Sequence, residues 1–228
     1  SILQNNNGFF SVSQTLSVDE RPIRTASGDW DADSDADLAV LLRDSTQVQI
    51  WLNGGTGTFS KQTTSYAVGS SPIDMITGDW DCDGNPDLAV SNTGDDTISL
   101  IYGKGNGTFA EHVAINSGRG PGSMASADFN NDNKMDFVVG HRFLVSTPGV
   151  SLLTGDFSLT LSDTSSVTGY ASSVSFAATT EEDGAPPAEI VIIDADNDSK
   201  LDLLITLPLA KKLAVLFGKQ YTGKLTCP

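Results

Sequence analysis

Four stretches of the sequence concentrate oxygen-bearing side chains at a fixed spacing. The first runs from Gly28 to Val40, GDWDADSDADLAV, and places an Asp at every second position from Asp29 to Asp37. Carboxylates this close together repel one another unless something neutralises them. Three chemistries are compatible with such a stretch: a solvated acidic turn, a catalytic pair of carboxylates, or a cage for a cation.

The same spacing recurs three more times along the chain. The related stretches are GDWDCDGNPDLAV, ADFNNDNKMDFVV and IDADNDSKLDLLI, and their first aspartates follow at intervals of 50, 49 and 66 residues. Counted from that first Asp, side-chain oxygens stand at positions 1, 3, 5 and 9 of every loop. The candidate side-chain ligands are Asp29, Asp31, Asp33, Asp37, Asp79, Asp81, Asp83, Asp87, Asp128, Asn130, Asp132, Asp136, Asp194, Asp196, Asp198 and Asp202.

A cation cage explains this register better than the two alternatives. Acidic turns without a shared purpose would not keep one register four times, and four equivalent copies do not resemble a single active site, where one carboxyl must hold a proton near neutral pH. Hard oxygen ligands in this number suit Ca²⁺, which takes about 6–8 of them, better than Mg²⁺, which demands a strict octahedron. No Cys or His cluster supports a transition metal. The sequence therefore predicts up to four structural Ca²⁺ ions and no catalytic residues.

The loops are not EF-hands, although their first half is similar. An EF-hand needs Glu at position 12, where this chain has Val40, Val90, Val139 and Ile205. Position 6 favours Gly for a sharp turn, and only Gly84 complies, so we expect the second loop to be the least strained. The third loop has one carboxylate fewer, and we expect it to bind its ion most weakly.

Each loop belongs to a longer repeated unit that reads as four short strands. A Pro stands seven residues before each first Asp, an apolar run follows each loop, and a second strand-like run comes after it. Two units then carry a near-identical turn, Gly55-Thr56-Gly57-Thr58-Phe59 and Gly105-Asn106-Gly107-Thr108-Phe109, and Asn6-Asn7-Gly8-Phe9-Phe10 reads as a degenerate third copy. A period of this length with four strands is typical of a β-propeller blade. The consecutive apolar residues after each loop indicate strands that are covered on both faces.

Composition supports an all-β fold and excludes some partners. The 228 residues include 22 Gly and carry a net charge of −16, with many turn-forming residues and few helix formers. Phosphate binding needs clusters of Lys and Arg, so we expect no nucleic-acid partner. No apolar run approaches 18 residues, so we expect no membrane insertion. Cys82 and Cys227 allow one disulfide or two free thiols, and Asn106 is a candidate glycosylation site.

The repeated unit resembles the FG-GAP/VCBS repeat, the blade unit of integrin-α-like calcium-binding propellers. The residues that carry the resemblance are the Asp-rich loop, the Asp-Leu-Ala-Val that follows it and the Gly-x-Gly-Thr-Phe turn, over nearly the whole chain except about 156–186. The resemblance implies a further ligand at position 7, the backbone carbonyl of Asp35, Asn85, Lys134 or Lys200. A Lys there is tolerable only if its carbonyl, and not its side chain, faces the ion.

The resemblance also implies a function, which we hold as an expectation. It favours an extracellular, non-enzymatic adhesion or recognition module, including carbohydrate binding, whose partner is an extracellular protein or a glycan. A structural or assembly module of a larger surface protein, fibre or enzyme is the alternative, and a hydrolase or lyase propeller is a third possibility. No ligand-binding residue can be named from the sequence.

The number of blades is open at this stage. We expect a single domain over 1–228, with a half blade in 1–21 and units in 22–71, 72–120, 121–186 (with an insertion) and 187–228. Ile2-Leu3-Gln4 resembles a third strand and Phe9 to Val18 a fourth. The ends could close a ring of four or five blades, belong to a larger ring, or pair with another subunit and so drive self-assembly. The insertion holds a strand-like Val174–Ala177, which is either the remnant of a fifth blade or an inserted hairpin.

Aromatic residues occupy position 2 of three loops. These are Trp30, Trp80 and Phe129, with Ala195 in the fourth loop. We expect them to pack between blades, and stacking on a sugar is the alternative. His112 and His141 stand apart from any Ser or Cys motif, so no hydrolase triad is indicated.

Overall fold

The computed structural model describes residues 1–128, 135–141, 149–153, 174–176, 189–207 and 212–216. Within these residues the chain forms strands and no helix, which confirms the all-β prediction. No described segment is a helix long and apolar enough to cross a bilayer.

The strands form five antiparallel sheets, and strands that follow one another in the chain pair within each sheet. The first sheet is a hairpin of two strands, the next three sheets have four strands each, and the last has three described strands. The strands are β1 (Ile2–Asn6) and β2 (Phe9–Gln14); β3 (Pro22–Gly28), β4 (Asp37–Leu42), β5 (Gln47–Asn53) and β6 (Phe59–Ala67); β7 (Pro72–Gly78), β8 (Asp87–Asn92), β9 (Thr97–Ile101) and β10 (Val113–Asn116); β11 (Pro121–Ala127), β12 (Asp136–His141), β13 (Gly149–Leu153) and β14 (Val174–Phe176); β15 (Glu189–Ile193), β16 (Asp202–Leu207) and β17 (Lys212–Leu216). Three four-stranded sheets in sequence match the predicted blade pattern.

Each acidic loop joins the first strand of a sheet to the second. The second strands β4, β8 and β12 begin at position 9 of their loops and are buried along almost their whole length. Because neighbouring residues of a strand point to opposite faces, burial at consecutive positions means that both faces are covered. This is what the apolar runs after the loops predict.

Each of the three four-stranded sheets packs one face on the next sheet along the chain. Ala39, Val48 and Ile50 of the first four-stranded sheet share a core with Met75 and Val90 of the second. The opposite face of that second sheet shares a core with the third, and the third shares one with β15 and β16. The molecule is therefore held together mainly by a series of sheet-to-sheet contacts.

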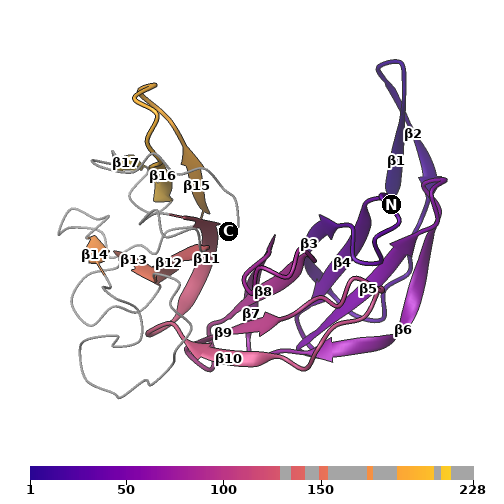
Figure 1. The fold of residues 1–228 in the computed structure, drawn as a ribbon, viewed down its shortest axis with the longest axis horizontal. Coiled ribbons are helices and arrows are strands. Elements are labelled where there is room, and N and C mark those ends of the chain that lie inside the picture. The colour runs from indigo at the N-terminus through magenta and orange to yellow at the C-terminus, as the bar shows by residue number, and fades with distance from the viewer. Residues whose placement is uncertain (129–134, 142–148, 154–173, 177–188, 208–211, 217–228) are drawn as a thin grey trace.

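The innermost strands β3, β7, β11 and β15 lie side by side, and the sheets follow one another around an open arc (Figure 1). The carboxylate of Asp74 on β7 joins three of these strands, because it accepts hydrogen bonds from Nε of Arg24 on β3 at 2.8 Å and from the N–H of Met124 on β11 at 2.9 Å. The β1–β2 hairpin and the β15–β17 sheet lie at opposite ends of the arc, so the described strands do not close a ring.

The structure differs from the sequence expectation in two segments. Strand β2 ends at Gln14 rather than at Val18, and the β1–β2 connection is a two-residue turn with φ of 54° at Asn7 and 91° at Gly8. Positive φ at both residues is typical of a type I′ hairpin turn, so this segment is not a copy of the longer Gly turns. In the expected insertion, Val174–Phe176 pairs with β13 as the outer strand of the third four-stranded sheet. It is therefore neither a remnant of a fifth blade nor an inserted hairpin of its own.

A pair of Leu→Ala substitutions tests the sheet-to-sheet core. Leu100 on β9 is fully buried in the contact with the third four-stranded sheet, whereas Leu213 on β17 is 58% exposed. We expect Leu100→Ala to lower the free energy of unfolding by about 2–5 kcal/mol because it leaves a cavity, and Leu213→Ala to change it by less than about 0.5 kcal/mol. Chemical denaturation measures both, and equal effects would contradict the packing described here.

Candidate metal centres

The backbone of the acidic loops turns sharply at two positions. Position 4 adopts a left-handed conformation in all three loops described in full, with φ of 61° at Ala32, 58° at Cys82 and 60° at Asn197. Position 6 does the same, at Ser34, Gly84 and Ser199. Only Gly84 adopts this conformation without strain, which agrees with the expectation that the second loop is the least strained. The left-handed conformation at position 4 could not be predicted from the sequence, because none of these three residues is Gly.

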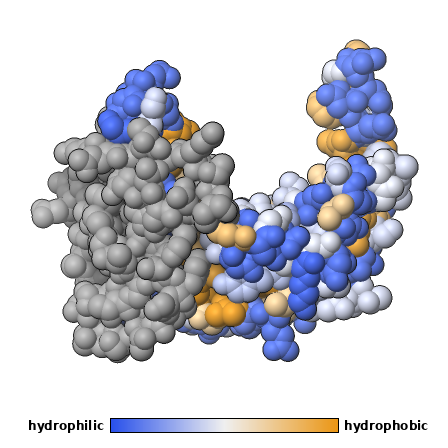
Figure 2. All heavy atoms as spheres, viewed as in Figure 1, coloured by the Kyte–Doolittle hydropathy of each residue, from blue (hydrophilic) through white to orange (hydrophobic). Residues whose placement is uncertain are grey.

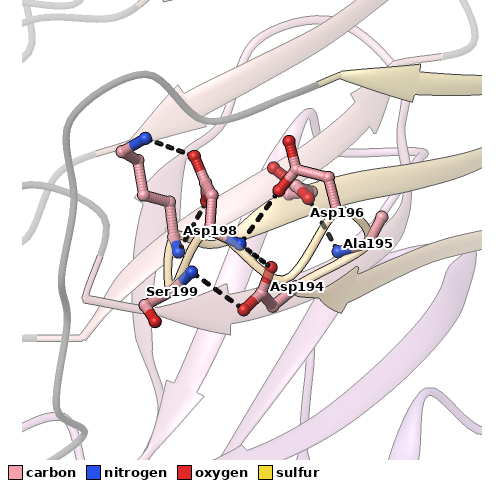
Figure 3. Close-up of polar contacts among 7 residues, drawn as sticks. Asp194, Ala195, Asp196, Asp198 and Ser199 are labelled. Carbon is pink, nitrogen blue, oxygen red and sulfur yellow. Dashed lines mark hydrogen bonds and ion pairs between the residues drawn. The ribbon is translucent and has the colours of Figure 1, made fainter.

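The carboxylate at position 1 holds this backbone in place. Both oxygens of Asp194 accept backbone hydrogen bonds, from the N–H of Asp198 and of Ser199 at 3.0 Å each (Figure 3). Asp29 accepts the equivalent pair from Asp33 and Ser34 at 3.1 and 3.0 Å. In the three loops described in full, the first Asp therefore stabilises the turn and brings the later carboxylates back towards itself.

The carboxylate at position 9 is buried and joins the loop to the sheet. Asp37 is fully buried, and its two oxygens accept hydrogen bonds from the N–H of Trp30 at 2.9 Å and of Asn53 at 2.8 Å. Asp87 repeats both contacts, with Trp80 and Gly103 at 2.8 Å each. This Asp thus ties the start of the loop to the last residue of the third strand in one sheet, and to a residue just beyond that strand in the next.

The structure gathers part of three of the four predicted ligand sets. One carboxylate oxygen from each of three residues lies within 4.8 Å of the others in Asp29, Asp31 and Asp33, in Asp79, Asp81 and Asp87, and in Asp194, Asp196 and Asp202. Asp83 and Asp198 instead accept hydrogen bonds from the backbone N–H of position 7, at 2.8 and 3.0 Å. In the third loop Asp128 and Asp136 are buried, and Asn130, Asp132 and Lys134 lie outside the described residues.

Burial and mutual repulsion disfavour the ionised carboxylates. Burial is the main reason why the pKa of Asp87 rises to about 7, and the charges of Asp81 and Asp79 add to it. Burial likewise raises the pKa of Asp31, Asp37 and Asp81, and neighbouring carboxylates raise them further. A bound cation would favour the charged forms and oppose this shift.

Asp31 provides the test of whether a cation fits the first loop. Its Oδ1 is buried and accepts no hydrogen bond from the described residues, and a buried carboxylate oxygen without a partner is costly. With Asp29 and Asp33 beside it, the donors are all hard oxygens, which suits Ca²⁺. These side chains, together with the carbonyl of Asp35, would hold the ion, and its charge would neutralise the cluster.

The fourth loop contains its own counter-charge. The ammonium of Lys200, at position 7, contacts the carboxylate of Asp198. This contact raises the pKa of Lys200 and lowers the pKa of Asp198. The Lys side chain therefore lies on the loop rather than away from it. Because it already neutralises one predicted ligand, we expect this loop to bind Ca²⁺ more weakly than the first two.

A Gly-rich turn of one unit contacts the acidic loop of the unit before it. The N–H of Gly107 donates a hydrogen bond of 2.7 Å to the carbonyl of Trp30, and the ring of Phe109 lies 5.8 Å from that of Trp30. The first Gly of the same turn faces its own loop, since a Cβ on Gly105 would lie 2.2 Å from Oδ1 of Asn85. The turn thus lies between two consecutive loops, which sequence reasoning missed because nothing in the motif indicates which loop it contacts.

The structure also shows the burial and contacts of the aromatic, Asn and Cys residues that the sequence singles out. Trp30 and Trp80 are 1% and 3% exposed and belong to the cores between sheets, in agreement with the packing interpretation and against sugar stacking. Asn106 is exposed and its Oδ1 accepts hydrogen bonds from Thr108. Cys82 forms no disulfide with a described residue, and Cys227 and Phe129 lie outside the described residues.

Comparison with known proteins agrees with this repeat. The FG-GAP-like repeat family matches residues 29–90 and again 79–139. These residues therefore belong to the FG-GAP-like repeat family, as the motifs predict. No curated protein matches the sequence.

Two solved structures are similar in fold. The crystal structure of BBS1N in complex with ARL6DN has 13% identity and a TM-score of 0.49 over 84% of this chain and 55% of that chain. The Tc holotoxin pore of Photorhabdus luminescens has 13% identity and a TM-score of 0.51 over 88% of this chain and 9% of that chain. The present chain therefore spans about half of the first chain and a small part of the second, and the likeness to the second concerns the fold alone.

Two glycines at the same place in the repeat test the contact between the turn and the loop. Gly57 and Gly107 both have positive φ, 73° and 76°, but a Cβ would meet no atom within 4 Å at Gly57 and would lie 2.8 Å from Cδ1 of Leu52 at Gly107. We expect Gly57→Ala to cost about 1–2 kcal/mol from backbone strain alone, and Gly107→Ala to cost more. Thermal unfolding of the two variants measures the difference, and an equal loss would show that the Leu52 side chain moves aside without cost and does not hold the turn in place.

Proposed function

We propose that this chain is an extracellular, calcium-binding β-propeller module that acts without catalysis in adhesion or recognition. The observation that carries the proposal is the recurrence of three acidic clusters in one place of the repeat, each between the first and second strands of its sheet. Ca²⁺ would neutralise the clusters and fix the loops, so that the sheets present a rigid outer surface. The family supports the extracellular setting, because FG-GAP-like repeats are typical of extracellular and surface proteins.

The absence of catalysis rests on the roles of the carboxylates. The carboxylates whose protonation burial favours most, such as Asp87, are committed to backbone hydrogen bonds and lie at equivalent places in successive sheets. A general acid needs access to a substrate as well as a suitable pKa. The loops therefore fit a structural role better than an active site, and we propose an extracellular protein or a glycan as the partner.

A second candidate is a structural or assembly module of a larger protein. It is favoured by the outer face of the β15–β17 sheet, where Leu213 and Val215 are 58% and 37% exposed. The chain also spans only 9% of the Tc holotoxin chain that it resembles in fold. In this role the sheets would pack against further sheets rather than capture a soluble ligand.

Calcium titration tests the shared part of both candidates. We expect isothermal calorimetry to detect up to four Ca²⁺ ions per chain, and thermal unfolding to shift upwards with Ca²⁺ and back with EDTA. A ligand that binds only the folded state adds about 2.7 kcal/mol when present at 100 times its Kd. If calorimetry detects no heat of binding and Ca²⁺ leaves the midpoint of thermal unfolding unchanged, the calcium sites are excluded.

Two Asp→Asn variants locate the effect. Asp31→Asn should weaken uptake at the first loop and reduce the Ca²⁺-dependent shift, while leaving the chelated protein equally or more stable, because it removes a partly buried charge that neighbouring carboxylates repel. Asp44→Asn is the matched control, since Asp44 is exposed and its carboxylate pairs with the exposed Arg21 at 3.4 Å. If both variants lose Ca²⁺ affinity equally, net charge and not the cage governs binding.

Glycan binding separates recognition from assembly. We expect the folded, Ca²⁺-loaded protein to retain specific glycans on an array and to lose them in EDTA. Retained fold without any glycan binding would argue against the carbohydrate proposal and leave protein recognition or assembly.

A further inference from the structure

Among the described residues, no further sheet covers the outer face of the β15–β17 sheet, whereas a sheet covers the same face of its counterparts. One row across the three strands consists of Val191, Leu204 and Val215. Leu213 lies on the same face, two residues before Val215 on β17. The corresponding row of the second four-stranded sheet is Ile76, Ala89 and Leu100, with Ile98 beside it. The side chains are apolar at equivalent positions of both sheets.

The side chains on these two faces differ in how far they are buried. Ala89, Ile98 and Leu100 are fully buried against the third four-stranded sheet, and Ala39, Val48 and Ile50 are fully buried in the same way one sheet earlier. In the last sheet Val191, Val215 and Leu213 are 39%, 37% and 58% exposed. The face thus continues an interface that the chain already makes three times, and its expected occupant is another apolar β-sheet face.

No described strand pairs with the outer edge of the same sheet. In the three earlier sheets the third strand pairs with a fourth on its outer side, whereas β17 pairs only with β16 among the described strands. Unpaired strand edges readily accept a strand from another chain.

An apolar hairpin lies uncovered at the other end of the arc. Leu3 pairs across the hairpin with Val12, and Phe10 lies on the same face, with exposed fractions of 56%, 63% and 67%. The space-filling view shows apolar atoms on the projecting hairpin and beside the β15–β17 end, with the hollow of the arc between them (Figure 2). A two-stranded hairpin is only marginally stable without a covering surface, and this one is held to β6 by two hydrogen bonds between Gln14 and the backbone of Phe59.

We propose that the β1–β2 hairpin of one copy packs on the outer face of the β15–β17 sheet of a second copy. A second copy is the occupant because the two surfaces lie at opposite ends of one molecule and do not contact each other. Such a head-to-tail contact is heterologous, and it generates a ring where the rotation closes and a filament where it does not. This goes beyond the proposed calcium-binding function, because it identifies how copies associate and which residues carry the contact.

Sedimentation equilibrium with two complementary variants tests the proposal. The wild-type chain, with Ca²⁺ and about 0.15 M salt to screen its net charge, should associate as its concentration rises. Phe10→Asp and Leu213→Glu should each weaken association by about tenfold or more, since each places a charge in an apolar contact. An equimolar mixture of the two variants should associate again as heterodimers, because one intact hairpin then meets one intact sheet face.

Controls separate this result from misfolding and from other contacts. Ser11→Asp adds the same charge to the opposite face of the hairpin and should leave association unchanged, and both test variants should keep the wild-type thermal midpoint and Ca²⁺ response. A chain that stays monomeric at every concentration overturns the proposal, whether its ends close on each other or take a different partner. Association that depends on Leu213 but not on Phe10 also overturns it, because a symmetric sheet-to-sheet contact would then be at work.

Discussion

The arrangement of this molecule depends on a buried carboxylate at the end of each acidic loop. Asp37 and Asp87 are fully buried, and each accepts one hydrogen bond from the start of its loop and one from the end of the third strand or just beyond it. These bonds fix where the second strand enters the sheet, and the apolar residues that follow then fall on the two covered faces. The same contact places Trp30 and Trp80 in the cores between sheets. The fold and the acidic clusters are therefore two results of one constraint.

That constraint makes the loops electrostatically costly. Burial disfavours the ionised form of Asp87, Asp81 and Asp31, and their carboxylates lie near others of like charge. The protein lowers this cost in different ways along the chain, with backbone N–H groups in every described loop and with the ammonium of Lys200 in the fourth. A divalent cation would do the same for the whole cluster, which is why the proposed role of Ca²⁺ is to hold adjacent strands and sheets in place.

Much of this could be read from the sequence, because it is periodic. The repeated register, the Pro before each loop and the unbroken apolar runs predict the four-stranded sheets and the loops that join their first two strands. The sequence does not separate the duties of the carboxylates: it assigns positions 1, 3, 5 and 9 alike, whereas the structure binds Asp37 and Asp87 to the backbone and pairs Asp198 with Lys200. It also misses the contact of Gly107 with the preceding loop and the pairing of Val174–Phe176, because both depend on long-range packing and not on local pattern.

A crystal structure of the protein grown with Ca²⁺, with anomalous scattering recorded, tests the central claim most directly. The claim predicts one anomalous peak in each of the first two loops, beside Asp29, Asp31 and Asp33 and beside Asp79, Asp81 and Asp87, with oxygen ligands at about 2.3–2.6 Å. Loops that keep the same backbone and carboxylate hydrogen bonds at saturating Ca²⁺, with no peak in either, would contradict it.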